Sequence, residues 1–279
     1  MVLRCLQWGR RKAFALLLVP ALMLGSVNMA EAAYVVASDN FDDPSYGFDG
    51  WDYQHAGTPD TGAMSVNQNG TMYATNDLSA GPITTDLYFS FTMTVGADTV
   101  LDPNMLVQFY FDSDPTNDPG STMPWTFAPS VGLKSDQGGA GTSDFQARFA
   151  YSDQQYSSAE QATVGGTVGI IAKLSKSGGS AYDTLDLWVT DGTDTMPDFS
   201  SLGTPDATSF SAASTLESVA TIGVFSVNLS GDDNFLLDNV VLATVPEPMT
   251  MALWGMGGIA GLAYSARRRK LANRNSETA

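Results

Sequence analysis

The stretch LYFSFTMTV at residues 87–95 decides the fold class of this chain. Its first, third, fifth, seventh and ninth residues are apolar, and the residues between them are tyrosine, serine and threonine. A strand turns successive side chains to opposite faces, so this period of two gathers the apolar side chains on one face. The stretch therefore predicts a β-strand with one face on a hydrophobic core.

The same alternation recurs along the chain, and two later stretches are nearly continuous apolar runs, as is typical of central strands. The alternating stretches are residues 105–111, 145–151, 168–174 and 185–189, and the apolar runs are residues 219–227 and 235–242. Clusters of Gly, Asp, Ser and Pro separate them, and no amphipathic helix of normal length lies between the termini. We predict an all-β fold, an antiparallel β-sandwich of the jelly-roll kind, over residues 33–244.

Residues 1–32 have the three parts of a secretory signal peptide. Basic residues precede an apolar run at residues 13–24, and small residues at positions 30 and 32 fit cleavage before Ala33. The run is shorter than the roughly 20 residues that a spanning helix needs. We expect a signal helix that signal peptidase removes; a retained N-terminal anchor is the alternative.

The C-terminal end, residues 245–270, has a second arrangement of three parts. In order, these are Val245, Pro246, Glu247 and Pro248, then the uncharged residues 249–266, then Arg267, Arg268, Arg269 and Lys270. As a helix, the uncharged part would span about 27 Å, enough for a bilayer core. A basic cluster stays on the cytoplasmic side as a membrane stop, so we expect a transmembrane helix with the sandwich on the far side. A short polar tail, residues 271–279, follows.

This ending resembles the PEP-CTERM sorting signal of Gram-negative bacteria, also catalogued as an ice-binding-protein C-terminal domain. The resemblance implies handling by an exosortase, a transpeptidase of the inner membrane, with processing near the Pro-Glu-Pro motif. It further implies localisation at the cell surface or in an exopolysaccharide matrix after processing. A plain single-pass anchor is the alternative.

The charge of the part between the two ends limits its partners. Residues 33–248 hold 28 acidic residues and four basic ones, a net charge of −24, whereas the whole chain has −17. A surface this acidic excludes nucleic acid as a partner, because phosphate contacts need Lys and Arg. The single cysteine, Cys5, lies in the signal peptide, so the exported chain would have no disulfide and no thiol chemistry.

A second resemblance covers the sandwich itself, which looks like the concanavalin-like (laminin-G-like) jelly rolls. The matching pieces are residues 40–43, 50–51, 87–91, 168–174, 183–189 and 235–240. The family implies glycan binding, and Trp125, in a proline-flanked loop, is our candidate for stacking on a sugar. Trp51, Tyr53 and Trp188 are further candidates, and packing in the core or at the rim of the sandwich is the alternative for Trp51 and Trp188.

A structural Ca²⁺ is the metal that the aspartate-rich composition of this chain favours. Asp238 alternates in register with Leu236, so we expect it to point to the interior with Val240 and Leu242, where a carboxylate needs compensation. In the similar jelly rolls an acid at this place binds Ca²⁺ together with the N-terminal segment, which implies Asp39 and Asp42 as its partners. Hydrogen bonds from a nearby loop, or a position facing solvent at a bulge, are the alternatives.

Catalysis has little support in the sequence. Laminarinase-like enzymes of this fold carry a Glu-x-Asp-x-x-Glu strand, and no such spacing occurs here. His55 is the only histidine, so neither a serine triad nor a zinc site has its partners. We therefore expect a non-enzymatic extracellular protein with an adhesive, matrix or glycan-binding role; a secreted glycoside-hydrolase-like sandwich is the alternative.

Overall fold

The computed structural model describes residues 34–39, 41, 52–54, 59–60, 62–67, 70–78, 81–113, 128–135, 145–149, 153–157, 162–193, 198–199 and 201–244. Every described residue belongs to one of the two units into which the chain divides, Ala33–Ala279. Among the described residues, no helix is both long and apolar enough to cross a membrane. Both expected terminal helices, at residues 13–24 and 249–266, lie outside this range.

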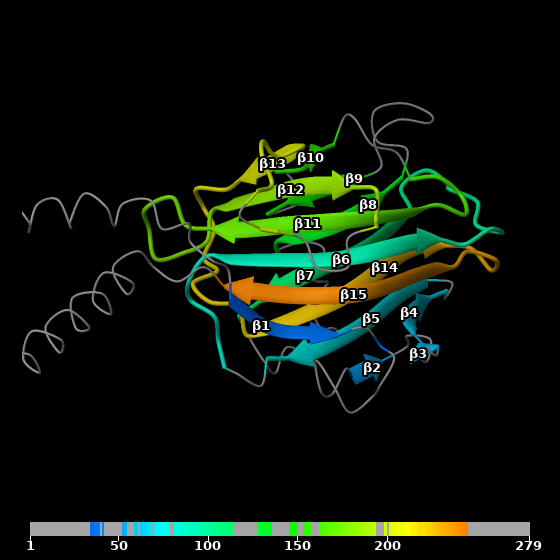
Figure 1. Ribbon diagram of the computed structural model, residues 1–279, viewed down its shortest axis with the longest axis horizontal. Helices are drawn as coiled ribbons and strands as arrows, with labels where there is room; N and C mark the ends of the chain where they lie inside the picture. Colours follow the sequence, from blue (N-terminus) through cyan, green and yellow to red (C-terminus); the bar gives the residue numbers. More distant parts are fainter. Residues whose placement is uncertain are drawn as a thin grey trace, which may run out of the picture. The chain divides into compact units, whose positions relative to one another are not determined.

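Two antiparallel sheets form the described part of the chain (Figure 1). Sheet A has the order β13-β12-β11-β6-β15-β4-β3, and β1 also pairs with β15. Its strands are β1 (Tyr34–Asp39), β3 (Pro59–Asp60), β4 (Ala63–Val66), β6 (Leu87–Val95), β11 (Thr167–Ser175), β12 (Thr184–Thr190), β13 (Ala207–Phe210) and β15 (Phe235–Thr244).

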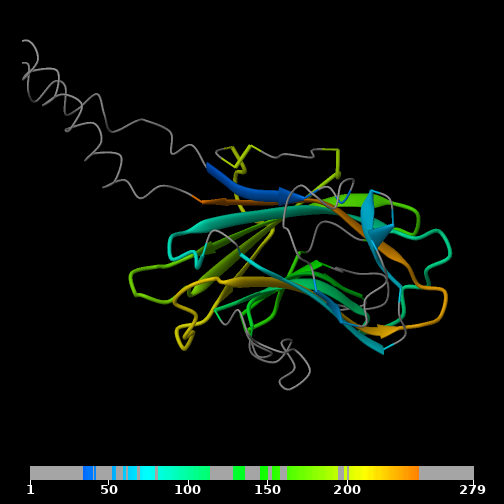
Figure 2. The same ribbon diagram turned by 90° about the horizontal axis from the view of Figure 1, so that it is seen from below.

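Sheet B has the order β10-β9-β8-β7-β14-β5-β2. Its strands are β2 (Asp52–Gln54), β5 (Gly70–Asp77), β7 (Leu106–Asp112), β8 (Ser130–Lys134), β9 (Phe145–Arg148), β10 (Gln155–Tyr156) and β14 (Thr221–Leu229). Figure 2 shows the two sheets as layers, with blue β1 beside orange β15 in the upper one. The predicted all-β antiparallel sandwich is confirmed.

The core lies between the sheets and follows the alternation of the strands. Phe89 and Phe91 of β6 meet Phe109 of β7, with ring centroids 4.9 and 4.6 Å apart. All three rings are buried. Buried aromatic pairs at this spacing add to the hydrophobic stabilisation of the sandwich. The stretch that predicts the fold is thus the central strand of sheet A.

The outer face of sheet A is covered by the chain's own apolar side chains. Phe199 stacks on Tyr88, with ring centroids 5.0 Å apart, and Trp188 donates a hydrogen bond from Nε1 to the carbonyl of Gly203. Together with Ile171, Val241 and Ala243, the rings of Phe199 and Trp188 make a second buried cluster. This cluster buries apolar side chains on that face of the sheet.

Candidate functional site

The outer face of sheet B carries a set of polar side chains that we call the polar face. Its members are Gln108, Ser130, Lys134, Gln146 and Arg148. Each alternates along its strand with a residue of the core, such as Phe109, Val131 or Ala147, so each points away from the core. All five are nevertheless buried, with exposed fractions between 0 and 8%. Buried polar groups away from a core need an explanation.

Strand register brings these residues together from three different strands. Gln108 of β7 pairs with Gly132 of β8, which pairs with Gln146 of β9, which pairs with Tyr156 of β10. Residues directly opposite one another in a sheet have side chains about 5 Å apart. The row therefore crosses four strands, and Gly132 lies between the amide side chains of Gln108 and Gln146.

A chain of hydrogen bonds joins β9 to β7 across this face. Arg148 donates from Nε to the hydroxyl of Ser130 (2.8 Å), which donates to Oε1 of Gln108 (3.1 Å). Gln108 in turn donates from Nε2 to the carbonyl of Leu133 (3.3 Å). The guanidinium carbon of Arg148 lies 5.5 Å from the ring centroid of Phe225 on β14. A hydrogen bond and a contact with an aromatic ring thus help to fix the guanidinium.

Two glycines allow close contacts between neighbouring strands of sheet B. Gly132 has φ +148°, and a Cβ there would stand 2.4 Å from the carbonyl oxygen of Val107 and 2.9 Å from Cα of Gln108. A Cβ on Gly223 would meet the ring of Tyr110 at 2.2 Å. Tyr110 and Phe225 belong to one buried cluster beside the polar face. The polar face is therefore bordered by aromatic rings.

Gln146 stands out because neither of its amide atoms has a hydrogen-bond partner in the part of the chain that the structure describes. Its side chain is fully buried. Leaving one buried donor or acceptor unsatisfied costs about 1–3 kcal/mol. An amide that points out of the core with both atoms unsatisfied is suited to a polar ligand or to ordered water.

Lys134 lies at the rim of the polar face near the edge strand β10. Its Nζ donates to Oε1 of Gln154 (3.0 Å) and to the hydroxyl of Tyr156 (3.5 Å), and Tyr156 also donates to Gln154. Burial, and then the positive charge of Arg148, lower the pKa of Lys134. Gln154 and Tyr156 are half-buried, so the polar face reaches solvent on the β10 side.

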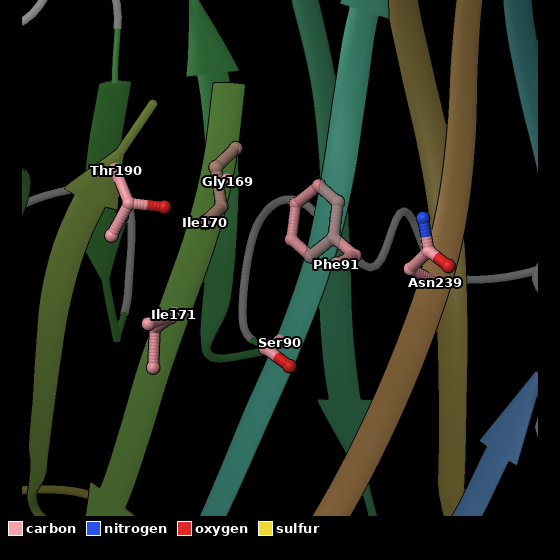
Figure 3. Close-up of a pocket in the computed structure, with 7 residues that line it drawn as sticks. All are labelled: Ser90, Phe91, Gly169, Ile170, Ile171, Thr190 and Asn239. Carbon is pink, nitrogen blue, oxygen red and sulfur yellow. The ribbon is translucent and has the colours of Figure 1, made fainter. Parts of the chain in front are cut away.

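A hollow on the outer face of sheet A is the alternative site (Figure 3). Its cavity volume is about 10 Å³, and Ser90, Ile171, Thr190 and Asn239 are among the residues that line it. The hydroxyl of Ser90 is buried without a partner within the described ranges. A cavity of about 10–15 Å³ holds one water molecule, so this hollow suits water better than a sugar ring.

The expected orientation of Asp238 is wrong, and a β-bulge is the reason. Leu237 and Val240 both belong to the core, although three positions separate them, because Asn239 adopts φ +53° and the pairing with β6 shifts there. Asp238 consequently leaves the sheet on the outer side. Its carboxylate accepts hydrogen bonds from the backbone N–H (2.6 Å) and Nδ2 (3.2 Å) of Asn239. The bulge is the arrangement that alternation cannot reveal.

Two of the three predicted calcium ligands, Asp39 and Asp238, lie in the described part of the chain. Asp39 lies opposite Val240, a core residue, and accepts a hydrogen bond from the backbone N–H of Phe41 at 2.7 Å. Asp39 and Asp238 therefore project from opposite faces of sheet A, and Asp42 lies outside the described residues. Within the described ranges, no three His, Cys, Asp or Glu side chains form a group that could hold a metal ion.

The remaining predicted sites cannot be placed. Trp125, the sorting motif at Val245–Pro248 and the basic cluster at Arg267–Lys270 all lie outside the described residues. The polar face was missed by sequence reasoning, although two signals were present. The alternation at 145–151 puts Gln146 and Arg148 on one face, and Lys134 and Arg148 are two of only four basic residues between the termini.

Comparisons with known proteins bear on the fold. No family model matches the chain, and no curated protein matches its sequence. Several solved structures match the fold of this chain. The carbohydrate recognition domain of Emp47p matches with a TM-score of 0.51 and 10% identity, over 77% of this chain and 98% of that one. The metal-free carbohydrate recognition domain of Emp46p gives a TM-score of 0.50 at 8% identity, over 75% and 95% of the two chains.

The exoplasmic/lumenal domain of VIP36, in a Ca²⁺/Man2-bound form, gives a TM-score of 0.50 at 8% identity, over 78% of this chain and 88% of that one. The sandwich of this chain thus has the lectin-like jelly-roll fold. At this level of identity the likeness concerns the fold.

Proposed function

We propose that this chain is an exported, extracellular β-sandwich that binds a glycan on the polar face of sheet B. The observation that carries the proposal is Gln146, whose buried amide has two unsatisfied atoms in a row with Gln108 and Tyr156. Sugars present hydroxyls that both donate and accept, and amide side chains complement them in both directions. The carbohydrate recognition domains of Emp47p and Emp46p share the fold, which is consistent with this proposal.

The surroundings of Gln146 combine polar groups with aromatic rings. Tyr110 and Phe225 lie beside the amides in a buried cluster, 2% and 0% exposed. Binding sites of small ligands commonly combine an aromatic wall with a few placed polar groups. Tyr156 and Gln154 are half-buried, so the β10 edge is the side of the polar face nearest to solvent.

Replacing the unsatisfied amide tests this site. We expect the full chain to bind at least one sugar on a glycan array, and Gln146→Leu to weaken that binding at least tenfold, because leucine keeps the volume but offers no donor or acceptor. The melting temperature should stay unchanged or rise, because the variant removes an unsatisfied buried amide.

Ser90→Ala is the matched control, since it removes an unpartnered buried hydroxyl from the opposite sheet. Equal loss in both variants, or loss in the control alone, would contradict the assignment to sheet B. A reducing-sugar assay on the bound glycans separates binding from hydrolysis, and sugar release would favour the hydrolase alternative.

The export and sorting expected from the two termini form part of the same proposal. The acidic sandwich between a signal peptide and a Pro-Glu-Pro motif fits a substrate of signal peptidase and then of an exosortase. Placement in an exopolysaccharide matrix would bring the polar face to its glycan. Mass spectrometry of surface-fractionated protein should find peptides of the sandwich and none that contain Arg267–Lys270; an intact C-terminus there would argue for a permanent anchor.

A further inference from the structure

The few positive charges of the sandwich are distributed unevenly. Residues 33–248 contain four basic residues among 28 acidic ones, and two of the four, Lys134 and Arg148, lie on the polar face. The other two belong to the region of sheet A. Lys173 lies 3.9 Å from a carboxylate oxygen of Asp86, and Lys176 donates to the carbonyl of Glu217 at 2.9 Å.

Lys134 differs from Lys173 in the charge of its partners. It is nearly fully buried, yet its partners in the described part of the chain are an amide oxygen and a phenol, both neutral. Burying an ammonium group without an anion is costly, and a second cation nearby raises the cost. The lowered pKa of Lys134 reflects both effects. An anion placed beside Lys134 would relieve them.

Strand geometry puts the unsatisfied amide within reach of this cation. Lys134 lies two residues after Gly132 on β8, hence on the same face, and Gly132 pairs with Gln146. Diagonal neighbours across a strand pair stand about 7–8 Å apart, within reach of long side chains. One ligand could therefore accept a hydrogen bond from Lys134 and satisfy the amide of Gln146 together.

We infer that the glycan bound on the polar face is an acidic saccharide whose carboxylate is received by Lys134, as in a polymer of uronic acids. This inference rests on the proposed function, because it names the sugar class for the same site. The carboxylate accepts from the ammonium, and ring hydroxyls exchange hydrogen bonds with Gln146. The net charge of −24 repels polyanions in general, so a preference for an acidic sugar has to come from a local positive site.

Matched polymers provide the test. Polygalacturonate, alginate and hyaluronan are each compared with their carboxyl-reduced forms, which keep the backbone and lose the charge, by calorimetric titration of the full chain. We expect at least one native polymer to bind ten times more tightly than its reduced form, and the difference to shrink as salt rises.

Lys134→Met should remove this preference without lowering the melting temperature, because it keeps the side-chain volume and removes a buried charge. Lys173→Met should keep the preference, although that lysine also lies over a tyrosine ring. Equal binding of native and reduced polymers in every pair, or an unchanged preference in Lys134→Met, would overturn the inference while leaving glycan binding intact. Absence of binding to every polymer and every array sugar would overturn the proposed function as well.

Discussion

Gly132→Ala is expected to lower the free energy of unfolding by about 3–5 kcal/mol, because the new methyl group would clash with backbone atoms of the neighbouring strand. The Cβ would stand 2.4 Å from a backbone oxygen and 2.9 Å from a backbone carbon, and backbone on a central strand cannot yield. The φ of +148° adds strain for any residue with a side chain. Chemical denaturation of the variant and the parent chain measures the difference.

Gly178→Ala separates the two causes. Gly178 has nearly the same φ, +146°, but a Cβ there meets nothing within 4 Å. We expect it to lose only about 1 kcal/mol, the cost of the backbone conformation. If both variants lost the same amount, the close approach of β7 to β8 beneath Gln108 would be refuted.

Arg148→Ala is expected to lower the free energy of unfolding by about 3–4 kcal/mol. The side chain is 1% exposed, lies over the Phe225 ring and donates to Ser130, so its loss leaves a cavity and removes the hydrogen bond that the Ser130 hydroxyl accepts. Arg148→Met keeps most of the volume and should lose less, about 1–2 kcal/mol. Thermal and urea denaturation of the two variants give the comparison.

Lys173→Ala is the control for removal of a cation that lies over an aromatic ring. Lys173 is 29% exposed and its ion pair with Asp86 is loose, so we expect a change below about 1 kcal/mol. A loss in Arg148→Ala no larger than that of the control would show that the arginine does not organise the polar face.

The alternation of apolar and polar residues predicted many of the strands, because each of these strands has one face on the core. The stretch at residues 87–95 coincides with β6, and the apolar run at 235–242 lies within β15. The exception is Asp238. The bulge at Asn239 adds a residue to the strand. Odd-numbered residues face the core up to Leu237, and even-numbered residues face it from Val240 onward. No local pattern of apolar residues contains this shift, because it depends on pairing with β6.

The polar face shows the other limit of sequence reasoning. The alternation of side chains along the strand places Gln146 on the face opposite its core-facing neighbours. It does not show which strands lie side by side. Gln108, Gly132 and Gln146 come from three stretches, and only the order β9-β8-β7 makes them a row. The predicted calcium ligands have a different limit, the bulge: Asp39 and Asp238 lie on adjacent strands but face opposite sides of sheet A.

Hydrogen exchange of the full chain with and without its tightest-binding glycan tests the location of the site most directly. We expect slower exchange at the amides of β8, β9 and β10 when the glycan is present, because a ligand on the polar face restrains those strands. Slower exchange confined to β6, β11 and β15, around the hollow lined by Ser90 and Asn239, would contradict it.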